Sequence, residues 1–298
     1  MNSCWRSASP PDSLPRVHVR VVVAAVLLAL VVAGVAEAPP RAQVAQARAP
    51  VAPAPVAVVA APIGEPRMVA PGGIEEAQRF ARRRGGTIGF AVAVPGKRIR
   101  GVNLDHRFYS ASVVKAMLAL AVVRAAPRRA LTAYERALLR PMITVSDNDA
   151  ASTVYARVGR DALLRIARAA GMTRFDVGFN WADALLTARD QARLFLRIDR
   201  LAPRRHRAYL RELLGSIVSW QRWGMAPVAE ERGFHVMFKG GWRIGIFHQV
   251  ALLERDGRRI ALAVLTSGTE HGYGRETQAG IAARVLARPV RRPGGGGA

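Results

Sequence analysis

The chain has 298 residues, half of which are hydrophobic, and this length allows one large domain or two small ones. Its formal net charge of +24 comes mainly from arginines that are scattered along the chain rather than gathered in a block, so no nucleic-acid partner is expected. The single cysteine, Cys4, excludes an internal disulfide and a zinc site built on cysteine pairs, and we expect neither a cofactor nor a metal.

Residues 1–38 are typical of a signal peptide or a membrane anchor. A basic stretch ending at Arg20 precedes an unbroken apolar run over 21–33, and small residues at 36–38 offer a cleavage site. The apolar run is long for a signal peptide and short for a full membrane span. Both alternatives predict a secreted or extracytoplasmic protein, associated with the cell envelope, that touches a membrane only through this segment.

Residues 39–72 are dominated by alanine, proline and valine. Repeated proline removes backbone donors and blocks helices, so this segment is predicted to be an extended linker. Residues 291–298 end in a glycine run and are predicted to be a tail. The remaining residues, 73–290, have the size of one ordinary domain, which we expect to be monomeric.

Hydrophobic periodicity within this domain predicts both helices and strands. In chain order the pattern predicts a helix over 74–84, strands over 87–94 and 98–103 joined by a turn at Pro95-Gly96, helices over 113–124, 132–140, 147–157, 160–170 and 187–198, strands over 234–238, 246–254 and 259–266, and a final helix over about 275–288. Strands at both ends with helices between them predict an α/β (α+β) fold, in which one antiparallel β-sheet is flanked by helices with an all-helical subdomain.

The first candidate motif is Ser112-Val-Val-Lys115. At this spacing on a helix, the two side chains lie on the same face, one turn apart. A serine hydroxyl becomes a good nucleophile when a base takes its proton, and a lysine can be that base when burial lowers its pKa. The pattern alone is common and is usually a solvated pair. It gains weight because lysine is rare here and this one lies in an apolar segment, where burial without a role would be costly.

The second and third motifs are Ser146-Asp147-Asn148 and Lys239-Gly240-Gly241. The first of these is also a good helix N-cap, and the two roles are compatible because a cap places short polar groups at a helix end. The other motif follows an apolar strand, where glycines allow close approach of a substrate backbone, although a bulge or tight turn is the alternative.

These three motifs, in this order, are the signature of serine β-lactamases and penicillin-binding proteins. The region 73–290 therefore resembles the class A-like serine β-lactamase and D,D-peptidase superfamily. The resemblance extends to Arg107-Phe-Tyr-Ser-Ala before the nucleophile and to Thr187-Ala-Arg-Asp190, which is similar to the segment leaving the omega loop. It implies the β-lactamase/transpeptidase-like fold.

The resemblance also implies a role for each motif residue. Ser112 would attack an amide or lactam carbonyl, Lys115 would accept its proton, and Ser146 would relay a proton to the leaving nitrogen. Asn148 would hold the substrate's side-chain amide, and Lys239, followed by Gly240 and Gly241, would bind the substrate carboxylate. Lys239 would also help to lower the pKa of Lys115. The oxyanion would lie between the backbone N–H groups of Ser112 and Trp242.

Three departures from the family pattern affect the expected activity. Ser146 follows Ser112 by 34 residues, a shorter separation than is usual in class A enzymes, so the cleft is expected to be more open. Gly240 replaces a threonine or serine that would help to hold the carboxylate. The segment 174–187 contains no glutamate. In class A enzymes, a glutamate of the omega loop activates the water that hydrolyses the acyl-enzyme. Its carboxylates are Asp176 and Asp183, and we interpret Asp183 as structural. The alternative that Asp176 or Asp183 replaces the glutamate as the base is left open.

Other polar and aromatic residues have simpler interpretations. The six histidines show no paired metal spacing, and His248 is interpreted as a satisfied sheet residue. Trp220 and Trp223 could line a cleft, although aromatic residues belong more often to a core. The main hypothesis is an exported serine hydrolase that forms an acyl-enzyme with β-lactams or peptidoglycan D-alanyl peptides. The alternative is a homologue that binds the cell wall with slow turnover or none.

Overall fold

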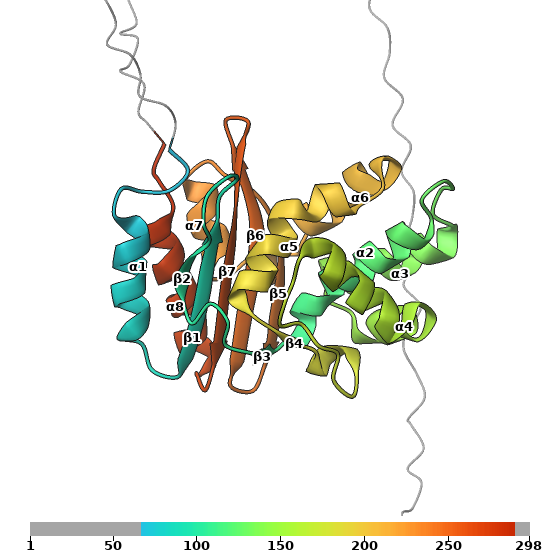
Figure 1. The fold of residues 1–298 in the computed structure, drawn as a ribbon, viewed down its shortest axis with the longest axis horizontal. Helices are drawn as coiled ribbons and strands as arrows, with labels where there is room; N and C mark the ends of the chain where they lie inside the picture. The colour runs from blue at the N-terminus through green and yellow to red at the C-terminus, as the bar shows by residue number, and fades with distance from the viewer. Residues whose placement is uncertain (1–66, 290–298) are drawn as a thin grey trace, which may run out of the picture. The chain divides into compact units, whose positions relative to one another are not determined.

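The computed structural model describes residues 67–289. The predicted signal peptide or anchor, most of the linker and the glycine-rich tail lie outside the described residues. The described part has a five-stranded antiparallel sheet in the order β2-β1-β7-β6-β5, with helices on both of its faces (Figure 1). This confirms the predicted antiparallel sheet flanked by helices. Among residues 67–289, no helix is long and apolar enough to cross a membrane.

The sheet joins the predicted N-terminal hairpin to the three C-terminal strands. Its members are β1 (Thr87–Ala93), β2 (Arg100–Val102), β5 (His235–Arg243), β6 (Ile246–Arg255) and β7 (Arg258–Ser267), while β3 (Phe108–Tyr109) and β4 (Leu185–Leu186) form a separate pair. The turn at Asp256-Gly257 has φ of 51° and 69°, as a tight hairpin turn with positive φ at both positions requires. The end predicted for the strand over 234–238 was wrong: β5 continues to Arg243, so Lys239-Gly240-Gly241 lies inside a strand.

Eight helices and four short 3-10 turns complete the described residues. The helices are α1 (Gly73–Arg82), α2 (Lys115–Ala125), α3 (Ala133–Thr144), α4 (Asn148–Ala170), α5 (Ala188–Leu201), α6 (Arg207–Gly215), α7 (Met225–Glu231) and α8 (His271–Val285), and the 3-10 turns are η1 (Ala111–Val114), η2 (Trp181–Asp183), η3 (Arg204–His206) and η4 (Ser219–Gln221). Within α4, Gly159 has φ of 73° and breaks the helical geometry, where two separate helices were predicted. Helices α6 and α7 and strands β3 and β4 were not predicted.

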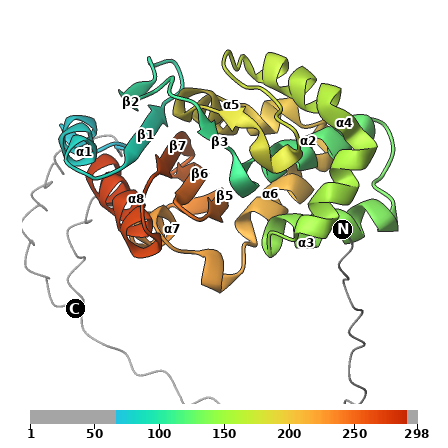
Figure 2. The ribbon, with the colours of Figure 1, turned by 90° about the horizontal axis from the view of Figure 1, so that it is seen from below.

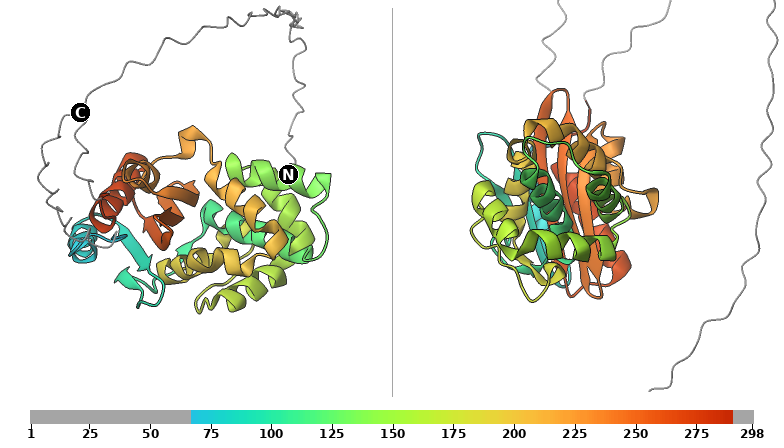
Figure 3. Two further views of the ribbon diagram at one scale, coloured as in Figure 1. Left: turned by 90° about the horizontal axis from the view of Figure 1, so that it is seen from above. Right: turned by 90° about the vertical axis from the view of Figure 1, so that its right-hand side faces the viewer.

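The helices divide between the two sides of the sheet. Helices α1, α7 and α8 lie together on one side, while α5 lies on the other and leads to a group formed by α2, α3, α4 and α6 (Figure 2). Viewed from the side of that group, the helices lie in front of the strands (Figure 3). This group is the predicted all-helical subdomain, and strand β5 is the edge of the sheet closest to it.

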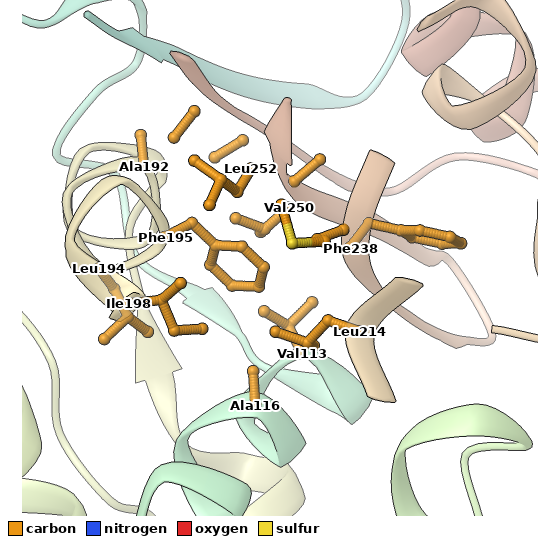
Figure 4. Close-up of a cluster of buried hydrophobic side chains, with 14 of the residues drawn as sticks. Val113, Ala116, Ala192, Leu194, Phe195, Ile198, Leu214, Phe238, Val250 and Leu252 are labelled. Carbon is orange, nitrogen blue, oxygen red and sulfur yellow. The ribbon is translucent and has the colours of Figure 1, made fainter. Parts of the chain in front are cut away.

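Apolar side chains from both parts meet in one core. The Phe195 ring from α5 lies among Val113, Leu214 and Phe238, which come from η1, α6 and β5 (Figure 4). All four side chains are at most 1% exposed. The turn η1 is therefore anchored on both sides of Ser112, because Ala111 and Val113 are buried while Ser112 is partly exposed.

The end of the predicted linker packs on the folded part. Val69 forms a bridge with Leu286, and Ala287 N donates a hydrogen bond to Met68 O at 3.1 Å. The buried Arg255 guanidinium donates to Arg67 O at 2.6 Å and to Ala287 O at 2.9 Å. These contacts hold residues 67–70 against the segment that follows α8.

Candidate active site

The site begins at the turn that carries Ser112. Ser110 Oγ accepts a hydrogen bond from Val114 N at 2.9 Å and so fixes the turn. Ala111 has φ of 45°, a left-handed conformation that is unusual for a residue with a side chain. Such backbone strain persists only where the surroundings impose it, and it is frequent at functional sites. Ser112 is the partly exposed second residue of this turn, three residues before the start of α2 at Lys115.

Lys115, the first residue of α2, is fully buried. Its Nζ donates to Ser146 O at 2.5 Å, to Ser146 Oγ at 3.2 Å and to Asn148 Oδ1 at 2.7 Å. Nζ also lies 4.8 Å from the centroid of the Trp181 ring. Burial lowers the pKa of Lys115 to about 8, and the charge of Asp147 partly opposes this change. This amine is therefore far closer to giving up its proton than an ordinary lysine.

The second motif forms the start of α4, where the predicted N-cap is present. Asp147 is the capping residue, because its Oδ1 accepts from Ala150 N at 2.7 Å. Ser146 has φ of 63° and is the second residue with a side chain that is held in the left-handed region beside this site. The cap by Asp147 leaves Ser146 and Asn148 free to meet Lys115.

Strand β5 brings the second lysine to the same serine. Lys239 Nζ donates to Ser146 Oγ at 3.1 Å and to Gly240 O at 2.9 Å. The side chain is fully buried, and burial together with the charge of Lys115 lowers the pKa of Lys239 well below its usual value. Ser146 Oγ is therefore the atom at which two buried lysines from distant parts of the sequence meet.

The two glycines that follow Lys239 differ in their surroundings. A methyl group on Gly241 would come within 2.8 Å of both Ser112 N and Val113 N, so β5 passes directly against the turn. A methyl group on Gly240 would make only ordinary contacts at 3.8 Å, with His248 O and the Trp223 ring. Glycine is required at 241 by this close approach, whereas a side chain fits at 240.

The structure thus brings Lys115, Ser146, Asn148 and Lys239 into one hydrogen-bonded group. Ser112 lies beside this group without joining it. Within residues 67–289 its hydroxyl makes no hydrogen bond, while Lys115 Nζ donates to Ser146 and Asn148. Catalytic hydrogen bonds are often loose before a substrate is bound, so this arrangement is compatible with a nucleophile and its base.

The omega-like segment 174–187 lies against the site without offering it a carboxylate. Asp183 Oδ1 pairs with Arg243 at 3.2 Å, and its Oδ2 accepts from Asn180 at 2.6 Å. Asp176 pairs with Arg160 at 3.0 Å. These contacts agree with the interpretation of Asp183 as structural. Trp181 is the side chain of this segment that reaches Lys115, a contact that sequence reasoning missed; the only signal was the scarcity of tryptophan.

His248 lies on β6, paired with Gly241 of β5. It is fully buried in β6, where Nε2 donates to Tyr109 O at 2.9 Å and Nδ1 accepts from Thr266 N at 3.1 Å. Burial lowers the pKa of His248 to about 4, so the ring is neutral at pH 7. It is a satisfied sheet residue, as interpreted from the sequence, and it ties the strand before Ser112 to the main sheet.

The described residues contain no cluster of three or more potential metal ligands among histidine, cysteine, aspartate and glutamate. The site brings the hydroxyl of Ser146 together with two buried lysine amines. Two of the chain's three lysines take part in it.

Residues 127–289, more than half of the chain, match the model of the beta-lactamase enzyme family. The chain belongs to this family. The match includes Ser146, Asn148 and Lys239, while Ser112 and Lys115 precede it. No curated protein matches the sequence.

Solved structures share the fold at low sequence identity. A β-lactamase from Sphaerobacter thermophilus is 21% identical, with a TM-score of 0.64 over 72% of this chain and 95% of that one. An ancestral class A β-lactamase is also 21% identical, with a TM-score of 0.60 over 71% and 98%. The structure of PBP-A is 17% identical, with a TM-score of 0.61 over 72% and 94%. The chain thus belongs to the beta-lactamase enzyme family by sequence and shares its fold with these β-lactamases and PBP-A.

Proposed function

We propose that this chain is an exported serine hydrolase that forms an acyl-enzyme at Ser112 with β-lactams or D-alanyl peptides. The observation that supports it most is the meeting of Lys115 and Lys239 at Ser146 Oγ, at 3.2 and 3.1 Å. With a pKa of about 8, about one Lys115 in ten is neutral at pH 7, against about one in several thousand for an ordinary lysine. Two buried amines with lowered pKa at one hydroxyl favour proton transfer over a structural role.

In the first step, neutral Lys115 accepts the proton of Ser112 while the serine oxygen bonds to the substrate carbonyl carbon. The negative charge that develops on the carbonyl oxygen needs preorganised donors. The N–H groups of Ser112 and Trp242 are the proposed donors. Their nearness is supported by the tight approach of Gly241 to Ser112 N. It is also supported by β5 being an edge strand, whose outward N–H groups are not used by a neighbouring strand.

In the second step, the carbon–nitrogen bond breaks and the leaving nitrogen needs a proton. Ser146 is proposed to donate it and to regain one from the ammonium of Lys115, so that the proton taken from Ser112 reaches the leaving group. Ser146 Oγ already accepts hydrogen bonds from both lysines. Asn148 and Lys239, with Gly240 and Gly241 along β5, are proposed to hold the substrate's amide and carboxylate.

Release of the acyl group is proposed to be slow. It requires a water activated by a base, and both carboxylates of the segment 174–187 are paired with arginines, Asp176 with Arg160 and Asp183 with Arg243. A homologue that keeps its acyl group, and acts mainly in binding peptidoglycan peptides or β-lactams, is the second candidate function. The cell envelope is the proposed location for either.

The test is to incubate the purified protein with a penicillin and to follow intact mass together with hydrolysis of a chromogenic cephalosporin. We expect a mass increase equal to one penicillin, absent in Ser112→Ala, and little hydrolysis. Absence of an adduct and of hydrolysis in the unaltered protein would overturn the proposal. Rapid hydrolysis that needs Ser112 would support the acyl-enzyme and contradict its slow release.

A further inference from the structure

Three tryptophans lie together beside the candidate active site. The ring centroids of Trp220 and Trp242 are 6.2 Å apart at an angle of 83°, and those of Trp223 and Trp242 are 5.9 Å apart at 78°. We call Trp220, Trp223 and Trp242 the tryptophan platform. Edge-to-face pairs of this kind are favourable and hold the rings in fixed orientations.

Two hydrogen bonds place the platform at the Ser146 end of the site. Val218 N donates to Thr144 O at 3.1 Å, and Gln221 Nε2 donates to Val145 O at 2.8 Å. The loop that carries Trp220 is thereby fixed beside the residues that lead into Ser146. At its other end the platform reaches Trp242, which directly follows the glycine packed against the Ser112 turn.

The outer part of the platform is open to solvent. Trp220 is 61% exposed, whereas Trp223 is 9% exposed and packs against the Trp242 ring. Val145, directly before Ser146, is 40% exposed. A solvent-exposed indole that packs against another aromatic ring is more typical of a surface that binds an apolar group than a single scattered apolar residue is.

At Gly240, the strand beside the platform offers no polar side chain. Gly240 faces the Trp223 ring, so a substrate group at this position meets glycine and indole instead of a hydroxyl. Lys239 directs its donors to Ser146 and Gly240 O inside the protein. Arg275 is a cation in contact with the platform, since its Cζ lies 4.8 Å from the centroid of the Trp223 ring. An anionic group held by Arg275 is therefore the competing occupant.

We propose that Trp220 and Trp242 bind an aromatic ring in the leaving-group half of the substrate. The site would then select acyl compounds whose departing part carries a ring beside the scissile carbon–nitrogen bond. The inference rests on the proposed function, because Ser146 marks the leaving-group side only if it passes its proton to the leaving nitrogen.

The test uses cephalosporins that share one 7-acyl group and carry a phenyl group, an acetoxymethyl group or a second carboxylate at the 3-position, on the leaving-group side. Acylation rates from intact mass are compared for the unaltered protein, Trp220→Ala and Trp220→Phe. We expect the phenyl compound to be preferred about 5- to 10-fold, Trp220→Ala to abolish this preference while changing the acetoxymethyl rate less than about 3-fold, and Trp220→Phe to restore most of it. Tyr134→Ala, which removes another exposed aromatic ring at the far end of α3, is the matched control.

A rate ratio that is the same in the unaltered protein and in Trp220→Ala would overturn the platform's role. A preference for the second carboxylate that Arg275→Gln removes would assign the position to an anion and would likewise overturn it. Calorimetry of the phenyl compound with Ser112→Ala separates this inference from the acyl-enzyme, since it needs no reaction. There, Trp220→Ala should weaken binding about 5-fold, and unchanged affinity would count against the platform even if no adduct forms in any variant.

Discussion

Lys239 Nζ and Ser146 Oγ, 93 residues apart in the sequence, are joined by a 3.1 Å hydrogen bond between the edge of the sheet and the start of α4. Because Lys115 reaches the same oxygen, this bond couples the sheet to the all-helical subdomain through buried amines. Burying two amines is costly unless they are satisfied or neutral. The lowered pKa values of Lys115 and Lys239 follow from this burial.

The acylation rate should depend on the protonation of Lys115. Burial lowers its pKa to about 8, and only the neutral amine can accept the proton of Ser112. The rate with a penicillin should therefore rise about tenfold per pH unit below 8 and level off above it. Intact-mass kinetics between pH 6 and 9.5 measure the profile. Lys97→Ala, which alters the exposed third lysine, should leave the profile unchanged, and a flat profile between pH 6 and 8 would exclude Lys115 as the base.

The two glycines of β5 should respond in opposite ways to a methyl group. Gly241→Ala would place a carbon 2.8 Å from the backbone nitrogens of Ser112 and Val113, and so would push the strand away from the turn. Because a shift near 1 Å can reduce a rate about 100-fold, we expect a loss of that size in acylation. Gly240→Ala meets only 3.8 Å contacts and is the control, with a change below about 3-fold. Equal effects of the two variants would contradict the close approach as the reason for glycine at 241.

Neither aspartate of the omega-like segment should act in release of the acyl group. Asp176→Asn and Asp183→Asn are each expected to change the lifetime of the acyl-enzyme less than about 3-fold, because both carboxylates are ion-paired with exposed arginines. Loss of either pair should reduce the free energy of unfolding by no more than about 1 kcal/mol. The lifetime is read from the decay of the adduct mass after removal of free penicillin. A 100-fold longer lifetime in one variant would identify that aspartate as the missing base.

Much of this arrangement could be predicted because it is local. The hairpin at Asp256-Gly257, the break at Gly159 and the cap at Asp147 follow from the conformations that these residue types prefer. The three motifs were recognisable because lysine and asparagine are rare in this chain. That the motifs belong to one site was implied by the family resemblance alone, and the meeting of both lysines at Ser146 Oγ was not predicted.

Features that depend on tertiary contacts escaped prediction. Strand β5 continues through Lys239-Gly240-Gly241 because each of these residues pairs with β6, from Val250 to His248, and the glycines alone suggested an end. Helix α7, with a proline inside seven residues, carries too weak a periodicity to be found. Trp181 and Lys115 are far apart in the sequence and meet only in the folded protein, so no local sequence pattern indicates their contact.

His248 should make the fold sensitive to acid. Its pKa is about 4 in the folded protein against 6.5 when unfolded, so the unfolded chain binds the extra proton between these values. The stabilisation from neutral His248 is therefore fully present above pH 6.5. The free energy of unfolding should fall by about 3 kcal/mol as the pH drops to 4, at about 1.4 kcal/mol per pKa unit. Denaturant titrations from pH 7.5 to 4 should show a shallower decline in His248→Gln, which cannot take up a proton. His235→Gln, at an exposed position in β5, should decline like the unaltered protein. Parallel curves for His248→Gln and the unaltered protein would mean that His248 does not stay neutral in the folded state.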